Sequence, residues 1–257
     1  MLPTIFLSHG SPMHAIEAGA AGEVWARITA TLPTPKAVLM VTAHWESHVP
    51  VLSGNPKPPM IYDFGGFPDA LSRIKYSAPG APDVAARAAA LLNAAGIHAG
   101  IDHERGMDHG TWVPLLKLFP AANVPVVQLS VQPALSPQHH FDVGRALTPL
   151  RDEGVLMVGS GHLTHNLRDW MMARGQTAPL PYAKQFQAWV FEQLMHHRVD
   201  ALTQYQTLAP EALRAHPTPE HFLPLFVALG AAGDSTATQL YDGFEGNALA
   251  MDAYQFG

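Results

Sequence analysis

Cysteine is absent from this chain of 257 residues, and charge is scarce. Without thiols there is no disulfide, thiolate nucleophile, cysteine-ligated zinc or iron–sulfur cluster. Lysine and arginine number 15 and aspartate and glutamate 21, so charged residues make up only 14% and the net charge is −6. A usual share is about 25%. Nucleic acids and anionic membranes bind basic patches, so this balance argues against either partner.

Long apolar runs are also missing. No segment approaches the roughly 18 uninterrupted apolar residues of a membrane span, and Met1–Gly10 lacks the basic start of a signal peptide. We therefore expect a cytoplasmic protein. Hydrophobic residues still make up 47% of the chain, which excludes disorder and suffices for a large core. Since no repeat or linker divides the sequence, we expect one domain over residues 1–257.

Short apolar runs alternate with helical patterns along the chain. Runs of about four to eight apolar residues are typical of buried parallel strands. The expected strands are Pro3–Ser8, Ala37–Ala43, Val124–Val131 and Gly154–Gly159. The expected helices are Pro82–Ala95, Ser136–Leu150, Tyr182–His197 and Glu220–Ala232. This alternation predicts a three-layer α/β sandwich with a mostly parallel central sheet, and its active site is expected at the carboxyl ends of the strands.

Histidine is unusually abundant, because its 15 copies equal lysine and arginine combined. Imidazole serves both as a metal ligand and as a proton carrier near neutral pH. Several histidines directly follow expected strands, where α/β proteins place their chemistry: His9, His44, His162 and His165. Two more lie at expected helix starts: the segment Asp108–Trp112, which contains His109, follows a loop and opens a further helix, and His221 lies in the first turn of Glu220–Ala232. A single histidine at a strand end is more often a surface residue, but several converging on one edge indicate a site.

Several standard catalytic motifs are absent. The sequence contains no HExxH zinc motif, no Walker A motif and no G-x-G-x-x-G after a strand. It also lacks the G-x-S-x-G of a nucleophile elbow. The segment His44-Trp45-Glu46 matches part of the facial triad of iron oxygenases. Because that triad usually belongs to a jelly roll, Glu46 is a weak candidate ligand.

Six short motifs follow one another along the chain. They are SHGSP (Ser8–Pro12), TAHWE (Thr42–Glu46), IYDFGGFP (Ile61–Pro68), DHGTWVPL (Asp108–Leu115), GSGHLTHNL (Gly159–Leu167) and HPTPEHFLPL (His216–Leu225). Together they resemble the class III extradiol ring-cleavage dioxygenases, and most of all their 4,5-DOPA dioxygenase-like subgroup. The resemblance runs from Ser8 to Gly257. It implies an enzyme that opens a catechol ring beside its two hydroxyls, using O₂ at a mononuclear non-haem Fe(II).

The resemblance also implies a set of metal ligands. His9 and His44 match the two ligating histidines, and His221 matches the third position. Glu220 is adjacent, and a carboxylate there would restore the triad usual for Fe(II) oxygenases. Three imidazoles also suit zinc. Fe(II) is therefore the expected metal, while a purified sample could hold Zn(II).

The remaining histidines of the motifs are expected to transfer protons or to border the site. His165 matches the acid–base histidine of the family, expected to take the second proton of the catechol, and it could also reach the metal as a fourth ligand. His109 matches a second active-site histidine that could donate to a developing oxygen charge. His162 and His216 flank the site ambiguously. Gly65 replaces an aromatic residue of the family's YDFYGFP motif, so the pocket could be wider here.

Two other functions are compatible with a histidine-rich α/β protein. A zinc-dependent hydrolase on the same scaffold would use an open position on zinc to activate water. A non-enzymatic binding protein would hold a metal or small molecule without turnover. Oxygen-dependent opening of a catechol separates the dioxygenase from both.

Overall fold

The computed structural model describes residues 1–176 and 178–257. Its centre is an eight-stranded sheet with the order β4-β3-β5-β2-β6-β1-β10-β7. The strands are β1 (Thr4–Ser8), β2 (Ala37–Glu46), β3 (Val51–Ser53), β4 (Gly100–Asp102), β5 (Val126–Val131), β6 (Val155–Gly161), β7 (Ala237–Tyr241) and β10 (Ala253–Phe256). A separate hairpin contains β8 (Phe244–Glu245) and β9 (Leu249–Ala250).

Parallel pairing holds the middle of this sheet together. β2 pairs in parallel with β5 and β6, and β6 also pairs in parallel with β1. β3 and β4 are parallel to each other, whereas β3 is antiparallel to β5 and the β10 and β7 side of the sheet is antiparallel. The predicted, mostly parallel sheet is therefore confirmed. All four buried runs identified as strands belong to its central part.

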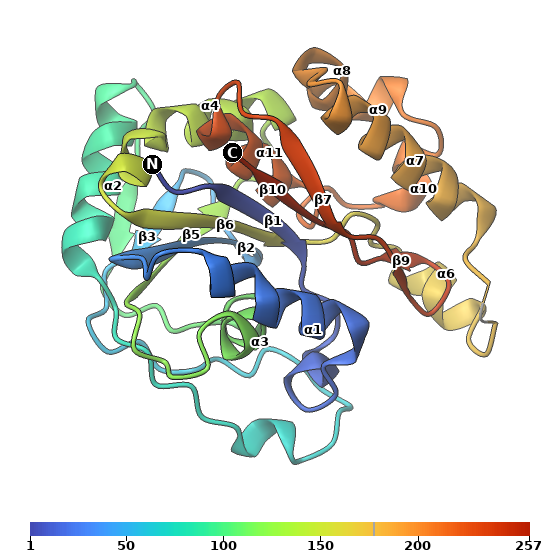
Figure 1. Ribbon diagram of the computed structural model, residues 1–257, viewed down its shortest axis with the longest axis horizontal. Coiled ribbons are helices and arrows are strands. Elements are labelled where there is room, and N and C mark those ends of the chain that lie inside the picture. Colours follow the sequence, from blue (N-terminus) through green and yellow to red (C-terminus); the bar gives the residue numbers. More distant parts are fainter. Residues whose placement is uncertain (177) are drawn as a thin grey trace.

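Helices cover both faces of the sheet (Figure 1). α1 (Gly19–Ile28) and α3 (His109–Leu118) lie on one face, and the other carries α2 (Pro82–Ala94), α4 (Pro137–Leu147) and α11 (Leu223–Ala232). Along β2, Leu39 and Val41 belong to the apolar core shared with α2, α4 and α11, while Val38 and Met40 belong to the core shared with α1 and α3. This alternation follows from the two-residue period of a strand, and it confirms the three-layer sandwich.

The other helices are short, except for one. They are α5 (Pro149–Asp152), α6 (Leu167–Met172), α7 (Pro181–Met195), α8 (Val199–Thr203), α9 (Tyr205–Leu208) and α10 (Ala212–Ala215). The expected helix Ser136–Leu150 is divided into α4 and α5 by Pro149, which has no N–H to continue the first helix. The long helix expected at Tyr182–His197 is confirmed as α7.

The end of β2 lies further along the chain than the sequence predicts. The expected strand stops at Ala43, but β2 continues to Glu46. After a register shift Glu46 pairs with Val131 of β5, so the extra residues remain in the sheet. His44 therefore lies within β2, in the irregular stretch between Val41 and Glu46, rather than after the strand.

The start of α11 also differs from expectation, and again a site histidine is affected. The helix begins at Leu223 rather than at Glu220, so His221 precedes it. The carbonyl of His221 accepts the backbone N–H of His162 at 2.7 Å, where a residue inside the first helical turn would accept a helical N–H. The prediction that His221 lies in the first turn of this helix is therefore wrong, because the helix begins two residues after it.

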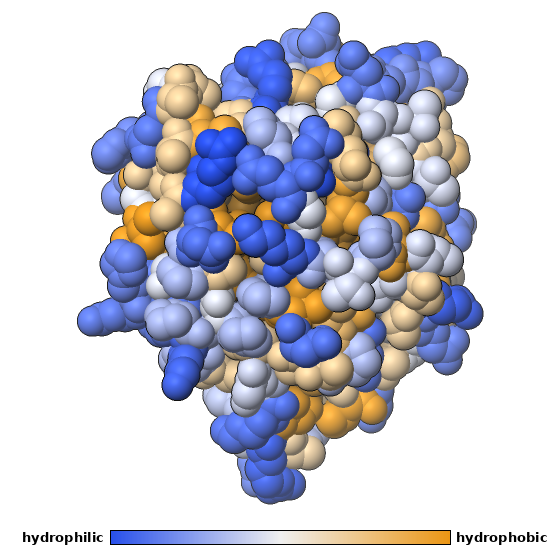
Figure 2. Space-filling model, turned by 60° about the vertical axis from the view of Figure 1, so that its left-hand side comes forward, coloured by the Kyte–Doolittle hydropathy of each residue, from blue (hydrophilic) through white to orange (hydrophobic). Residues whose placement is uncertain are grey.

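Across the described residues no helix is long and apolar enough to cross a membrane. On the face shown in Figure 2, hydrophobic residues form separate patches among hydrophilic ones.

Candidate metal centre

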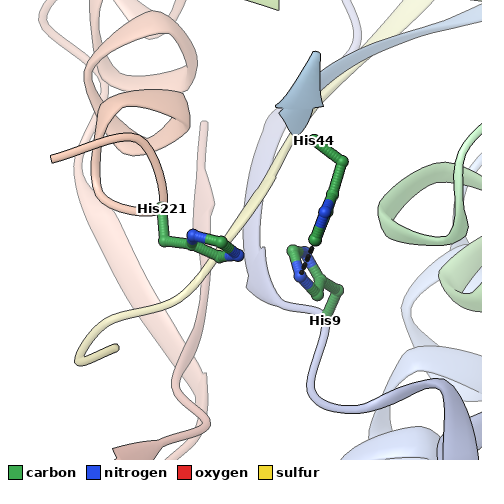
Figure 3. A group of neighbouring side chains, drawn as sticks. All are labelled: His9, His44 and His221. Atoms are coloured by element: carbon green, nitrogen blue, oxygen red, sulfur yellow. Dashed lines mark hydrogen bonds between the residues drawn. The ribbon is translucent and has the colours of Figure 1, made fainter. Parts of the chain in front are cut away.

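The carboxyl ends of β1, β2 and β6 bring the first part of the site together. His9 directly follows β1, His44 lies near the end of β2, and Ser160 belongs to β6. The Nε2 atoms of His9 and His44 are 3.0 Å apart (Figure 3). Two nitrogens bound to one tetrahedral zinc ion lie roughly 3.3 Å apart, given Zn–N bonds of about 2.0–2.1 Å. The two imidazoles thus face each other at a separation that a shared cation would impose.

Hydrogen bonds fix the ring of His9. Ser160 donates its hydroxyl proton to the carbonyl of Gly110, so its oxygen must accept from Nδ1–H of His9, at 3.0 Å. The proton of His9 is therefore on Nδ1, and the lone pair on Nε2 is free. A Cβ at Gly110 would lie only 2.8 Å from Cδ2 of His44, so glycine permits the close approach of α3 to the histidine pair.

His221 reaches the same point from the opposite side (Figure 3). One nitrogen from each of His9, His44 and His221 lies within 4.8 Å of the other two. The carboxylate of Glu220 accepts Nδ1–H of His221 at 2.9 Å, which again leaves Nε2 free. The structure thus brings His221 into the cluster and places Glu220 behind it as a hydrogen-bond partner.

The turn that carries His221 rests directly on β6. Its carbonyl oxygen lies against Gly161, where any Cβ would collide with it. The neighbouring backbone N–H of His162 donates to the same oxygen. The small residues of the GSGH segment therefore let a distant part of the chain approach the strand end closely.

Burial keeps the imidazoles of the cluster neutral. His9 is 2% exposed and His221 6%. Burial lowers the pKa of both rings well below the usual value, and the neighbouring histidines lower it further. Burial, followed by the charge of His109, lowers the pKa of His44 to about 3. Neutral imidazole is the form that binds metal ions, so this cluster is compatible with metal binding.

His165 lies at the side of this cluster. Its ring stacks on that of His221, with centroids 3.5 Å apart and planes inclined by 14°. Its Nδ1 is 4.0 Å from Oε1 of Glu220. Burial lowers the pKa of His165 to about 4, so the ring is neutral at pH 7 and can accept a proton.

The two ambiguous histidines have different surroundings. His162 is 2% exposed, its ring centroid is 5.1 Å from that of His9, and its Nδ1 has no hydrogen-bond partner within the described part of the chain. Nδ1 of His216 likewise has no partner among the described residues, but its Nε2 donates to the carbonyl of Leu163 at 2.8 Å and its ring stacks on Phe222. His216 is therefore a packed core residue, whereas His162 borders the cluster.

Asp63 is the site residue that sequence reasoning missed. Its Oδ1 accepts both Nδ1–H and the backbone N–H of His109, each at 3.0 Å, and its Oδ2 lies 3.4 Å from Nδ1 of His44. Burial alone would raise the pKa of Asp63, but the hydrogen bonds and charge of His109 together lower it to about 2. The available signal was weak: Asp63 is simply the acidic residue of the IYDFGGFP motif.

Glu46, the weak candidate from the sequence, stays outside the cluster. Its carboxylate belongs to none of the possible ligand groups among the described residues. Burial, and then the charge of Glu220, raise its pKa. It therefore shares the neighbourhood of the site but does not face the three histidines.

The fold and this cluster define an α/β protein whose strand ends carry a site compatible with metal binding. Comparison with known proteins narrows the class. Residues 3–251 match the family of the catalytic LigB subunit of aromatic ring-opening dioxygenase. The chain belongs to this family, and the predicted extradiol ring-cleaving activity is confirmed at the level of reaction class.

The relatives are similar over their whole length. The 4,5-DOPA dioxygenase extradiol of Beta vulgaris is 41% identical over 259 residues, covering 98% of this chain and 96% of that protein. The 4,5-DOPA dioxygenase extradiol of Portulaca grandiflora is 43% identical, covering 98% and 95%. The crystal structure of an uncharacterized protein of Escherichia coli K12 matches with a TM-score of 0.84 at 35% identity, and the match covers 100% of both chains.

Proposed function

We propose that this protein opens a catechol of the DOPA type with O₂ at a single Fe(II) held by His9, His44 and His221. One observation carries the ligand assignment: Nδ1 of His9 and Nδ1 of His221 are each held by a hydrogen bond, and Nδ1 of His44 lies 3.4 Å from the carboxylate of Asp63. One nitrogen from each of the three rings is therefore left to face the same small space. The names of the relatives, 4,5-DOPA dioxygenase extradiol, support the substrate class.

The chemistry of the family favours iron over zinc. Three neutral imidazoles accommodate either metal, but zinc has no redox chemistry, and ring opening transfers electrons from the catechol to O₂. When bound, Fe(II) lowers the pKa of the catechol hydroxyls and holds both reactants side by side. One carbon–carbon bond of the ring breaks and both oxygen atoms enter the product, so no external reductant is consumed.

In this proposal the two remaining histidines handle proton transfer and the charge that forms on oxygen. His165 is neutral at pH 7 and accepts the second hydroxyl proton of the catechol, which it later returns. His109 lies beside His44, with ring centroids 4.0 Å apart. Because its Nδ1–H is given to Asp63, it stabilises charge that develops on oxygen only after its Nε2 has taken up a proton. Preorganised groups of this kind act most strongly in a buried site.

Stacking argues that His165 is a base and not a fourth ligand. The lone pairs of imidazole lie in the ring plane. The rings of His165 and His221 are nearly parallel, with centroids 3.5 Å apart, so their in-plane lone pairs do not converge on one point. His221 would therefore hold the metal, while His165 keeps its lone pair for a proton.

Gly65 affects the substrate pocket. Phe64 contacts the edge of the His109 ring, with centroids 5.7 Å apart, so this loop lies beside the site. A Cβ on Gly65 would meet no atom within 4 Å, so this position leaves open space. We propose that the pocket admits catechols with bulky substituents.

We also propose that residues 1–257 form one domain, because β1 pairs with β10 from the other end of the sequence.

Anaerobic loading with Fe(II), followed by a catechol panel and O₂, tests the function. The panel contains DOPA, unsubstituted catechol and a catechol with a bulky side chain. We expect a yellow ring-opened product and one O₂ consumed per product. Oxygen-independent hydrolysis, or stoichiometric metal binding with no turnover of any catechol, would overturn the proposal. His44→Ala under the same conditions controls for free iron.

A further inference from the structure

We propose that Asp63 is a positioning residue that orients two histidines of different roles, His44 and His109, with a single carboxylate. The inference rests on the proposed function, in which His44 binds the metal and His109 serves the substrate. It deepens that function by making one loop residue responsible for both.

Each carboxylate oxygen of Asp63 contacts a different imidazole ring. Oδ1 is 3.0 Å from Nδ1 of His109 and also accepts the backbone N–H of His109. Oδ2 is 3.4 Å from Nδ1 of His44. The hydrogen bond from His109 to Oδ1 fixes the Nδ1–H tautomer of that ring. The negative charge of Oδ2 beside Nδ1 of His44 favours a proton on that nitrogen too, which leaves Nε2 of both rings directed away from the carboxylate.

The loop that carries Asp63 is attached to the start of α3 rather than to the sheet. Ile61 donates its N–H to the carbonyl of Met107 at 2.6 Å, and Met107 donates to Pro59 at 2.7 Å. The indole N–H of Trp112 donates to the carbonyl of Ile61 at 3.1 Å. These bonds hold the backbone two residues before Asp63 against α3, and the N-terminus of that ten-residue helix favours a negative charge.

The neighbouring acidic residue cannot replace Asp63. Asp108 is completely buried, and its carboxylate is occupied by Thr42, Thr111 and Arg105. Its role is to cap α3 and join it to β2. Asp63 is thus the acidic side chain that contacts both rings, and losing it affects the metal and the substrate side of the site together.

The first test measures metal affinity and needs no turnover. Zn²⁺ is titrated into the metal-free protein in competition with a chelator. Asp63→Asn should weaken binding by about 10- to 100-fold, the usual cost of removing a partner of a ligating histidine. Asp69→Asn, an exposed position on the same loop, is the matched control and should bind as the wild type does. Wild-type affinity in Asp63→Asn would overturn the link to His44.

Nitrogen-15 NMR of the wild-type histidines is a second test that requires no variant of Asp63. We expect the Nδ1–H tautomer for both His44 and His109 in the metal-free protein, assigned with His44→Gln and His109→Gln. Observation of the Nε2–H tautomer on either ring would overturn the proposal for that ring, whether or not the Asp63 variant folds.

Kinetics with saturating Fe(II) test the link to His109. Asp63→Asn and His109→Ala should each lower kcat, and the double variant should be no slower than His109→Ala within about twofold, because contacting residues of one network are not additive. Losses that multiply would overturn this link. If the wild-type protein opens no catechol, the proposed function fails, while zinc affinity and tautomer still decide the positioning role.

Discussion

The site consists of two parts that are built differently. The strand half consists of His9, His44 and Ser160, which lie on or directly after three neighbouring strands. In the parallel register Ser160 pairs with Leu7 on one side and Thr42 on the other, and His9 and His44 each lie two residues further along. The loop half is made of residues from connections and helix starts: Asp63, His109, His165, Glu220 and His221.

The two halves differ in what positions their residues. Parallel pairing with β6 brings the ends of β1 and β2 to one edge of the sheet, so His9 and His44, each two residues past a partner of Ser160, lie near each other. The loop half depends on single contacts, such as the N–H of His162 on the carbonyl of His221. We infer that the strand half supplies two of the three metal-facing rings at a fixed position, whereas the loop half supplies the third ring and the groups that act on protons.

Removal of a strand-half ligand should have the largest effect. His9→Ala or His44→Ala leaves at most two of the three ring nitrogens in the cluster. We expect no stoichiometric metal by elemental analysis after dialysis. His48→Ala, an exposed histidine just beyond β2, should retain full occupancy. Full occupancy in either cluster variant would show that the strand half does not hold the metal.

Removal of the base in the loop half should separate binding from turnover. His165→Ala should retain the metal and lose about 10²- to 10⁴-fold in kcat, the usual contribution of a general base. The assay is catechol-dependent O₂ uptake together with metal content of the same sample. Loss of metal in this variant would instead identify His165 as a ligand.

Gly161→Ala tests the contact that joins the halves. The added methyl would collide with the carbonyl of His221, so the loop half must move away from β6. Overpacking of this kind costs about 1–3 kcal/mol in stability, and metal affinity should fall with it. Urea unfolding and zinc competition measure the two effects. Gly100→Ala in β4, where a Cβ meets nothing within 4 Å, should change neither.

Removing the hydrogen-bond acceptors of the ligand histidines should have a smaller effect on metal binding, and the size of this effect should differ between Glu220 and Ser160. Glu220→Gln removes a charge behind His221, whereas Ser160→Ala removes a neutral hydroxyl behind His9. Hydrogen bonds to charged groups are roughly twice as strong as neutral ones, so Glu220→Gln should weaken zinc binding more, while both variants still bind one equivalent. Failure of Glu220→Gln to bind any metal would favour Glu220 itself as the third ligand.

The smallest effect on the site concerns a buried carboxyl near the strand half. Asp252 accepts from Gln187, Gln239 and Tyr254, yet burial raises its pKa to about 7. Between about pH 4 and pH 7 the folded protein therefore holds a proton that the unfolded chain releases, so stability falls as pH rises, by up to about 1.4 kcal/mol per pH unit. Asp252→Asn should flatten this slope in urea titrations and leave metal affinity unchanged.

The strand half could be predicted from the sequence because its signals are local. Buried apolar runs mark β1, β2 and β6, and parallel strands bring their carboxyl ends to one edge. Local patterns could not show that Asp63 faces His44, since that contact depends on a loop held by α3. They also misplaced His221 relative to α11, because the hydrogen bond from His162 that occupies its carbonyl comes from residues far away in sequence.

The position of β1 between β6 and β10 has a consequence for how the site is assembled. During synthesis β1 is made first, yet its partners follow only at Val155–Gly161 and Ala253–Phe256. Contacts between such distant segments form slowly. His9 is therefore made long before the strands that hold β1 in the sheet, so we expect the histidine pair to form only after β6 and β10 have joined β1.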